Sequence, residues 1–540
     1  MKVGYVIKEA TSDYFYFAIN PHYRNNIAIG SLLKININDT SYYAIVEDIR
    51  SEAIEEERLA DFEAIEVIYD KIGKKIYILK GKAIFIGCLK NEKVLPEKPK
   101  TPPLPGDEVL LASYEEVEKI YSFDDEYTIP FGKILAGDKE YVINLSIKNL
   151  IIRHTGIFGI TGSGKSTAVA NIIYELSKRN IPIVVFDIHR DYILSFENPI
   201  IITFSKREKE YLEKITKERG INALIFNAKL NLKLLKDRAE IIGINETVMP
   251  HVYYLLEKIL LTKSNITTTK ELLEYLDSGE IKNSILKNYE EKDAERIVRS
   301  LKSRLNRVRD WRIFSTNLND IGDDIIKLLD EIIEKLLKLE SISEIEYIEN
   351  EDEVTLKKYE NLRNIILIDL YPLSIEEQKI VLDVLLEFLY EKYKKLKFEG
   401  RSDILGMVIE EAHRFVSKES KETAIKVSTI AREGRKFGLG LLLVSQVPSG
   451  ILDSIISQIN TFLLLKIINP KDLNFIRETC PYLSREYFKA LTKLETGKCL
   501  VVGLSVKNPA IVNIIKKVSV GGAEEDIEKA IDRRIKLIKN

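Results

Sequence analysis

The chain has 540 residues, enough for about three domains, and 45% of them are hydrophobic and 30% charged. This composition excludes a disordered chain, and the net charge of −2 excludes DNA binding through a strong overall positive field. The three cysteines lie far apart, which excludes a disulfide framework and fits a reducing compartment. Since the apolar runs are too short to span a bilayer, we expect a cytoplasmic protein without a membrane segment.

The first 135 residues are predicted to form a small β-barrel. Short runs rich in aromatic and β-branched residues alternate there with turn residues, at 14–19, 41–46, 75–79, 82–87 and 108–112. Lys80 and Gly81 separate the third and fourth runs, which predicts two strands with a break between them. The proline-rich stretch after residue 95 could be a linker, but we favour a loop of the barrel because a strand follows it.

From about residue 150, strand and helix patterns alternate, which is typical of an α/β fold with a parallel sheet and crossover helices. We assign 136–204 and 361–519 to this core. The intervening stretch, 205–360, is predicted to be a helical insertion, and 520–540 a C-terminal helical tail. One helix of the insertion has apolar residues at helical spacing, at Ile297, Leu301, Leu305 and Val308.

Residues 159–166, GITGSGKS, match the phosphate-binding loop pattern G-x-x-x-x-G-K-[ST] at every fixed position. A strand pattern precedes the loop and a helix pattern follows it, which disfavours the alternative of a chance glycine-rich turn. We expect Lys165 to reach the β and γ phosphates of ATP and the Ser166 hydroxyl to bind Mg²⁺. The predicted ATP contacts are Gly159, Thr161, Gly162, Ser163, Gly164, Lys165, Ser166 and Thr167.

A second motif ends an apolar run, 404–409, with two acids, Glu410 and Glu411. We expect Glu410 to orient the Mg²⁺ shell through a bound water and Glu411 to be the general base that polarises the attacking water. The alternative is a solvated pair of acids after a core strand.

Asp187 ends another predicted strand, at the edge where parallel sheets bind ligands. It could contact Mg²⁺ or the catalytic water, or it could cap the next helix. Asp369, at the end of its own strand, is a weaker candidate. His189 is interpreted as structural because no metal-spaced companion accompanies it.

Three further residues follow the two acids. Arg432 and Arg435, in AREGRKFG, are candidates for an arginine finger at a neighbouring subunit's γ-phosphate; the alternative is a basic surface loop. Gln446 ends an apolar run, where its amide could sense hydrolysis at the γ-phosphate.

The helix predicted at 296–309 is strongly basic, and such helices can bind phosphate backbones without reading sequence. The alternative is a solvated face balanced by Glu290, Glu291 and Glu295. Its basic residues are Arg296, Arg299, Lys302, Arg304, Arg307 and Arg309.

In chain order, RHTG, GITGSGKST, FDIHRDY, IEEAHRF, AREGRKFG and SQVPSG together resemble the HerA family of the FtsK–HerA superfamily of P-loop ATPases. PPLPG in the strand-rich region is similar to that family's barrel domain. The resemblance covers nearly the whole chain, with 205–360 matched only loosely. It implies a RecA-like core in a hexameric ring that translocates double-stranded DNA with ATP and Mg²⁺. It also implies a NurA-type nuclease partner in DNA end resection and recombinational repair.

The resemblance assigns Lys165 and Ser166 to phosphate and Mg²⁺, Glu411 to the base and Asp187 to the acid of the second motif. Arg435 matches the finger position best, with Arg432 beside it, and the tail resembles a segment that braces a neighbouring subunit. Glu410 replaces the usual Asp, which puts the geometry of the Mg²⁺ shell in doubt. The alternative function is an ATP-regulated ring scaffold that activates an effector nuclease without processive movement, which should fail to displace an obstacle from DNA.

Overall fold

The computed structural model describes residues 1–53, 77–90, 93–95, 97–123, 127–136, 139–263, 265–278, 280–315, 322–338, 364–417, 420–481, 483 and 485–520. The predicted tail, apart from residue 520, lies outside this described part. The chain divides into two compact units. The first contains Met1–Ile172, Ser445–Ser449 and Ile456–Lys517, and the second contains Ile173–Val444, Gly450–Ile455 and residues 518–520.

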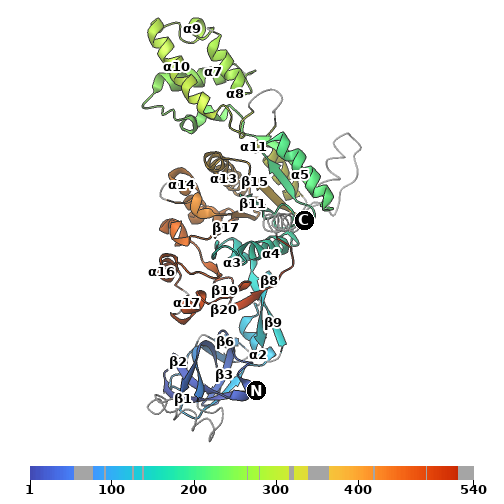
Figure 1. The fold of residues 1–540 in the computed structure, drawn as a ribbon, viewed down its shortest axis with the longest axis vertical. Helices are drawn as coiled ribbons and strands as arrows, with labels where there is room; N and C mark the ends of the chain where they lie inside the picture. The colour runs from blue at the N-terminus through green and yellow to red at the C-terminus, as the bar shows by residue number, and fades with distance from the viewer. Residues whose placement is uncertain are drawn as a thin grey trace, which may run out of the picture. The chain divides into compact units, whose positions relative to one another are not determined.

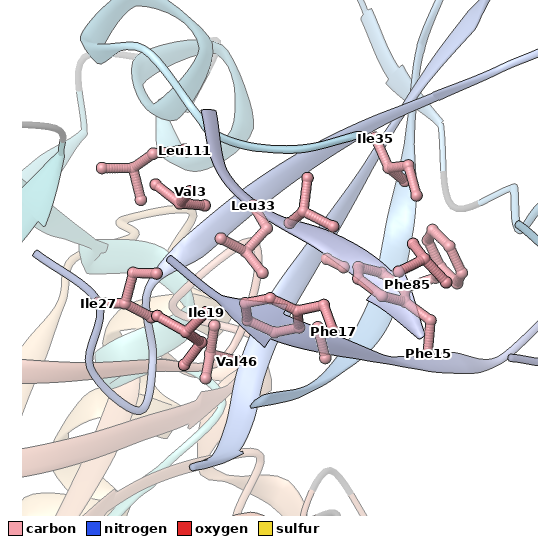
Figure 2. Packing of buried hydrophobic residues seen from close by; sticks show 14 residues of the cluster. Val3, Phe15, Phe17, Ile19, Ile27, Leu33, Ile35, Val46, Phe85 and Leu111 are labelled. Carbon is pink, nitrogen blue, oxygen red and sulfur yellow. The ribbon is translucent and has the colours of Figure 1, made fainter. Parts of the chain in front are cut away.

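A barrel occupies the N-terminal part of the first unit. Its strands follow the order β2-β1-β7-β3-β4-β5-β6, and β2 also pairs with β5, which closes the sheet. The strands are β1 (Lys2–Ala10), β2 (Tyr14–Ile19), β3 (Leu32–Ile37), β4 (Thr40–Ala53), β5 (Tyr77–Lys90), β6 (Lys93–Leu95) and β7 (Glu108–Leu111). Side chains alternate inward along β2, so Phe15, Phe17 and Ile19 fill the barrel core (Figure 2).

The predicted break at Lys80 and Gly81 is wrong, because β5 runs through both residues and pairs with β2 along them. Gly81 is opposite Phe17, and a Cβ on Gly81 would lie 2.4 Å from ring carbons of Phe17. The glycine therefore makes room for an aromatic ring in the barrel core.

The loop after the proline-rich stretch belongs to the barrel, as we expected. The Gly106 N–H donates to the Val6 carbonyl at 2.9 Å, and the Val6 N–H donates to the Asp107 carbonyl at 2.9 Å. The Leu104 N–H donates to the Asp107 carboxylate at 2.7 Å. These bonds fix residues 104–107 against β1.

The first unit also contains strands in the order β10-β18-β19-β20-β8-β9. β10 and β18 run parallel and are fully buried, whereas the other pairs are antiparallel. The strands are β8 (Thr128–Ala136), β9 (Lys139–Ser146), β10 (Thr155–Phe158), β18 (Thr461–Leu464), β19 (Lys498–Gly503) and β20 (Ala510–Ile514). The described α-helices whose residues lie wholly or partly in this unit are α2 (Tyr114–Tyr121), α3 (Ile147–Ile151), α4 (Lys165–Ser177), α15 (Asp453–Ile456), α16 (Pro470–Thr479) and α17 (Arg485–Leu491).

The second unit holds an all-parallel set of strands in the order β14-β13-β12-β15-β11-β16-β17. They are β11 (Ile183–Asp187), β12 (Ile200–Thr203), β13 (Leu224–Lys229), β14 (Asp323–Asp324), β15 (Ile365–Asp369), β16 (Leu405–Ile409) and β17 (Leu439–Ser445). The strands β11, β12, β15, β16 and β17 are buried at every position, as expected of a parallel sheet covered on both faces. The predicted α/β class is confirmed.

The segment predicted as a helical insertion is mostly helical, but β13 and β14 lie within it and join the sheet through β12. Its helices include α5 (Lys206–Glu218), α6 (Leu234–Asp237), α7 (Pro250–Thr262), α8 (Thr269–Asp277), α9 (Glu280–Ser284), α10 (Glu291–Val308) and α11 (Ile325–Lys338). α10 packs against α7 and α8 (Figure 1). It buries Ile297, Leu301, Leu305 and Val308, as their spacing predicted.

Three other elements of the second unit matter below, namely α13 (Ile375–Phe398), α14 (Lys421–Glu433) and the short 3-10 helix η7 (Gly434–Lys436). In the described part of the chain, no helix is long and apolar enough to cross a membrane.

Candidate nucleotide site

The predicted phosphate-binding loop connects the end of β10 to the start of α4, in the first unit. Gly162 and Gly164 have φ values of +74° and +105°, which favour glycine. At Gly159 an added Cβ would lie 2.8 Å from both the Leu465 Cβ and the Ser163 Oγ. Nothing lies within 4 Å of the Cβ position at Gly162, so the loop has open space at its turn. The geometry fits a cradle of backbone amides for phosphate.

Lys165, Ser166 and Thr167 form the half-buried first turn of α4. The Lys165 ammonium donates to the Ile160 carbonyl of the same loop at 3.0 Å, so its charge is held at the loop. The first N–H groups of a helix and its dipole favour an anion at this end. A serine hydroxyl here is a hard oxygen ligand of the kind that Mg²⁺ accepts.

Gln446 meets the loop, as its predicted sensing role requires. The Thr161 hydroxyl donates to the Gln446 side-chain carbonyl at 2.7 Å. The Gly159 N–H donates to the Ser445 carbonyl at 3.3 Å, so the residues at the end of β17 contact the loop at two points.

Sequence reasoning missed a second segment that supports the loop, the residues before β19. The Gly497 N–H donates to the Ser163 carbonyl at 3.1 Å, and the Thr496 hydroxyl donates to the Gly162 carbonyl at 3.4 Å. The Thr-Gly turn before an apolar strand was visible in the sequence, but nothing in it indicated a partner more than 300 residues earlier.

In the second unit, Asp187, Glu410 and Glu411 follow the carboxyl ends of two neighbouring parallel strands, β11 and β16. Asp187 is fully buried, and its carboxylate accepts the N–H groups of His189 at 3.1 Å, Asp191 at 3.3 Å and Tyr192 at 3.1 Å. Burial raises the pKa of Asp187 to about 7. No helix follows β11 directly, so Asp187 caps none; its carboxylate organises the loop after the strand instead.

Glu410 is buried, and one of its oxygens accepts a hydrogen bond from the hydroxyl of Tyr192, which is itself fully buried. Burial raises the pKa of Glu410 to about 8, although the Tyr192 hydrogen bond opposes the rise. The hydrogen bond from Tyr192 fixes the orientation of this carboxyl group, which would be able to hold a water of a bound Mg²⁺. The sequence offered no sign that Tyr192 serves Glu410.

Glu411 has a left-handed backbone, with φ at +45°, and its residue is only 9% exposed. Its Oε2 lies 3.2 Å from His413 Nδ1, which is close enough for an ion pair when the imidazole is protonated but lacks the geometry of a hydrogen bond. A non-glycine residue in this conformation costs roughly 1–3 kcal/mol and is typical of active sites. A buried carboxylate on a strained backbone suits a general base.

Arg432 lies in the last turn of α14 and Arg435 lies in η7, and both side chains are exposed. Neither forms an ion pair with any residue that the structure describes. Gly438, with φ at +83°, follows them, and a Cβ there would lie 1.8 Å from the Asp403 carbonyl oxygen. The arginine segment is thus fixed at its end while both guanidinium groups face solvent.

Asp369, the weaker candidate for a site residue, has a structural role. Its carboxylate accepts from the Arg190 guanidinium at 3.0 and 2.7 Å and from the Thr203 hydroxyl at 2.9 Å. Among the described residues no group of three or more His, Cys, Asp and Glu side chains could hold a metal ion.

Comparison with known proteins gives one family and several relatives. Residues 129–389 match the model of the family described as "Helicase HerA, central domain". A protein from Sulfurisphaera tokodaii named "DNA double-strand break repair helicase HerA" is 28% identical over 520 residues, covering 96% of this chain and 93% of that protein. The protein of the same name from Saccharolobus solfataricus is 27% identical, covering 95% of this chain and 92% of its own length. A solved structure of VirB4 from Thermoanaerobacter pseudethanolicus is 14% identical, covering 73% of this chain and 98% of that one, with a TM-score of 0.45.

Proposed function

Because the chain belongs to the HerA family, we propose that it is an ATP-driven motor that moves along double-stranded DNA. The observation that carries this proposal is the similarity, along more than nine tenths of both chains, to two proteins named as DNA double-strand break repair helicases. The phosphate-binding loop geometry agrees with it. We further propose a hexameric ring that acts in DNA end resection and recombinational repair with a NurA-type nuclease.

In this proposal the loop amides and Lys165 bind the β and γ phosphates of ATP, and Ser166 holds Mg²⁺. Magnesium, when bound, neutralises charge that develops on the phosphate oxygens. Lys165 already lies at the loop through the Ile160 carbonyl, so it exchanges one oxygen acceptor for another when phosphate binds. This exchange costs little reorganisation.

Glu411 is the proposed general base, which takes a proton from the attacking water. Its neighbour Glu410 is fixed by Tyr192 and would help to orient the water shell of a bound Mg²⁺. Gln446 reports loss of the γ-phosphate, because its contact with Thr161 couples the phosphate loop to the end of β17.

Arg435 and Arg432 are the proposed finger residues that reach a neighbouring subunit's ATP in the ring. Their exposed guanidinium groups, without ion-pair partners among the described residues, support a role outside their own subunit. A guanidinium there would stabilise the charge of the transition state.

The test is ATP hydrolysis with and without linear double-stranded DNA, beside Glu411→Gln. We expect DNA to stimulate hydrolysis and the variant to lose about 10²–10⁴-fold in kcat, the range of a general base. Hydrolysis that ignores DNA would contradict the motor and favour the scaffold that activates a nuclease. An obstacle-displacement assay would then decide, since a scaffold leaves a bound obstacle on DNA.

Mixed rings test the shared site. Inactive Glu411→Gln subunits mixed with inactive Arg435→Ala subunits should recover partial hydrolysis, because some interfaces then combine an intact base with an intact finger. A mixture as inactive as its components would sink the finger assignment. Repeating the mixture with Arg432→Ala shows which arginine is used.

A further inference from the structure

The helix α10 is strongly basic, and some of its basic side chains have no ion-pair partner among the residues that the structure describes. Between residues 296 and 309 the helix and its C-terminal end carry six basic residues and no acid. The apolar side packs inside the helical segment, through Leu301 and Leu305, both fully buried. The opposite side of α10, where Arg296, Arg299 and Arg307 lie, is exposed.

Three of the six basic residues have partners within the protein. Lys302 forms an ion pair with Asp277, and Arg309 pairs with Asp310 at 3.2 Å. Arg304 donates to the Gly243 carbonyl at 3.1 Å and to Ser300. These three side chains tie α10 to its surroundings.

The other three, Arg296, Arg299 and Arg307, are exposed. No acid in the described part of the chain, Glu295 included, forms an ion pair with any of them. At about 100° per residue they fall within an arc of roughly 80°, and at about 1.5 Å per residue they span roughly 16 Å of one helix face. Lys292, also exposed, extends the same row toward the N-terminus.

Local helix electrostatics does not account for this row. The acids Glu291 and Asp293 lie in the first turn, where the helix dipole favours them, and Arg307 lies in the last turn, where it favours cations. Arg296 and Arg299 lie in the middle of the helix, where the dipole gives no such benefit. Three unpaired guanidinium groups in one row also repel one another unless an anionic partner covers them.

We infer that this arginine face of α10 binds the phosphate backbone of double-stranded DNA. A duplex strand presents one phosphate per roughly 3.4 Å of axis, so the row can meet several phosphates at once. The guanidinium fork suits phosphate oxygens, and such contacts carry no sequence information. The inference rests on the proposed function only for the kind of nucleic acid. It adds a contact made by the 205–360 segment, for which the family resemblance gave no role.

The experiment measures binding of a fluorescein-labelled 30-base-pair duplex to the full chain, without nucleotide, across a series of salt concentrations. The test variant carries Arg296→Glu, Arg299→Glu and Arg307→Glu together. The control carries the same charge change on α5, at Lys206→Glu, Lys214→Glu and Lys217→Glu, three exposed residues that are interleaved with acids. All six positions are exposed, so both variants should keep the wild-type melting temperature.

We expect the α10 variant to bind roughly 10-fold or more weakly near physiological salt, and the slope of log K against log salt to fall by about 2–3, at about 0.9 per lost phosphate contact. The α5 variant should keep a slope within about one of the wild type. Equal slopes of log K against log salt in the two variants would overturn the inference. The arginine face would then contact an acidic protein partner or only solvent.

Hydrolysis separates this result from the proposed function. If DNA stimulates hydrolysis by the wild type but the α10 variant keeps the wild-type slope of log K against log salt, only the inference about α10 is wrong. If duplex binding depends on α10 but DNA does not stimulate ATP hydrolysis, only the proposed motor function is wrong.

Discussion

The phosphate loop and the acid-bearing strand ends form their sites in different ways. The loop between β10 and α4 relies on backbone, with left-handed glycines and one carbonyl that holds Lys165. The ends of β11 and β16 rely on side chains, with a buried tyrosine that holds Glu410. Backbone sites depend on residues whose spacing is fixed in sequence, whereas side-chain sites depend on partners that only the fold brings together. Substitutions can test this difference directly.

The largest effect should come from Gly164→Ala, which forces a side chain into a backbone conformation with φ at +105°. We expect ATP affinity to fall about 100-fold, because the loop must rearrange to relieve the strain. Calorimetric titration with a non-hydrolysable analogue measures it. Gly220→Ala is the matched control, since Gly220 has φ at +68° and nothing within 4 Å of an added Cβ, and no site residue lies near it in sequence. An equal loss of affinity in both variants would contradict the backbone account.

Tyr192→Phe should have the next largest effect. Without the tyrosine hydroxyl, Glu410 loses the hydrogen bond that fixes its orientation, so we expect kcat to fall about 10-fold while ATP affinity stays the same. Tyr393→Phe is the control, because Tyr393 is also buried but its hydroxyl has no hydrogen-bond partner among the described residues. If both variants hydrolyse ATP at the wild-type rate, the side-chain account of this edge is wrong.

The effect of Glu410→Gln on the stability of the fold should depend on pH. The pKa of Glu410 is raised from 4.5 to about 8, so the folded state holds a proton that the unfolded chain releases between these values. Wild-type stability therefore falls as pH rises from about 5 to about 8, by up to about 1.4 kcal/mol per pKa unit, and the variant lacks this loss. The melting temperature of the variant minus that of the wild type, measured without nucleotide, should grow with pH. A constant difference would show that burial does not penalise the Glu410 charge.

The smallest effect should come from the contact between the phosphate loop and the end of β17. Gln446→Ala and Thr161→Ala each remove the same 2.7 Å hydrogen bond, and we expect each to lower DNA-stimulated hydrolysis a few-fold. The double variant should be no worse than the worse single variant, since the two residues share one interaction. Additive losses would show that Gln446 acts independently of Thr161.

The difference between backbone sites and side-chain sites also explains which features could be predicted from the sequence. The glycine turn at 159–166 could be predicted residue by residue, because each fixed position of the motif answers a local need, such as glycine for a left-handed backbone. The two acids after 404–409 were located because an apolar strand that ends in charge is also local. In contrast, Tyr192 and Glu410 are 218 residues apart, and no pattern in either segment predicts their contact.

The fold shows a similar limit. The runs at 14–19 and 108–112 became strands because alternating burial is a local pattern. Gly81 was misinterpreted because glycine marks both turns and close approaches, and only the position of Phe17 distinguishes them. Likewise β13 is only partly buried and its burial does not alternate regularly, so its sequence did not separate it from the helices around it.

The closed barrel has a consequence for how the chain folds as it is made. β1 pairs with β2 on one side and with β7 on the other, where Tyr5 is opposite Glu108. A ribosome makes the β1–β2 hairpin early, but β1 keeps one open edge until β7 emerges. Unpaired edges invite pairing with other chains, and long-range strand pairs form slowly. The nascent chain therefore passes through a vulnerable interval whose length is set by the spacing between β1 and β7.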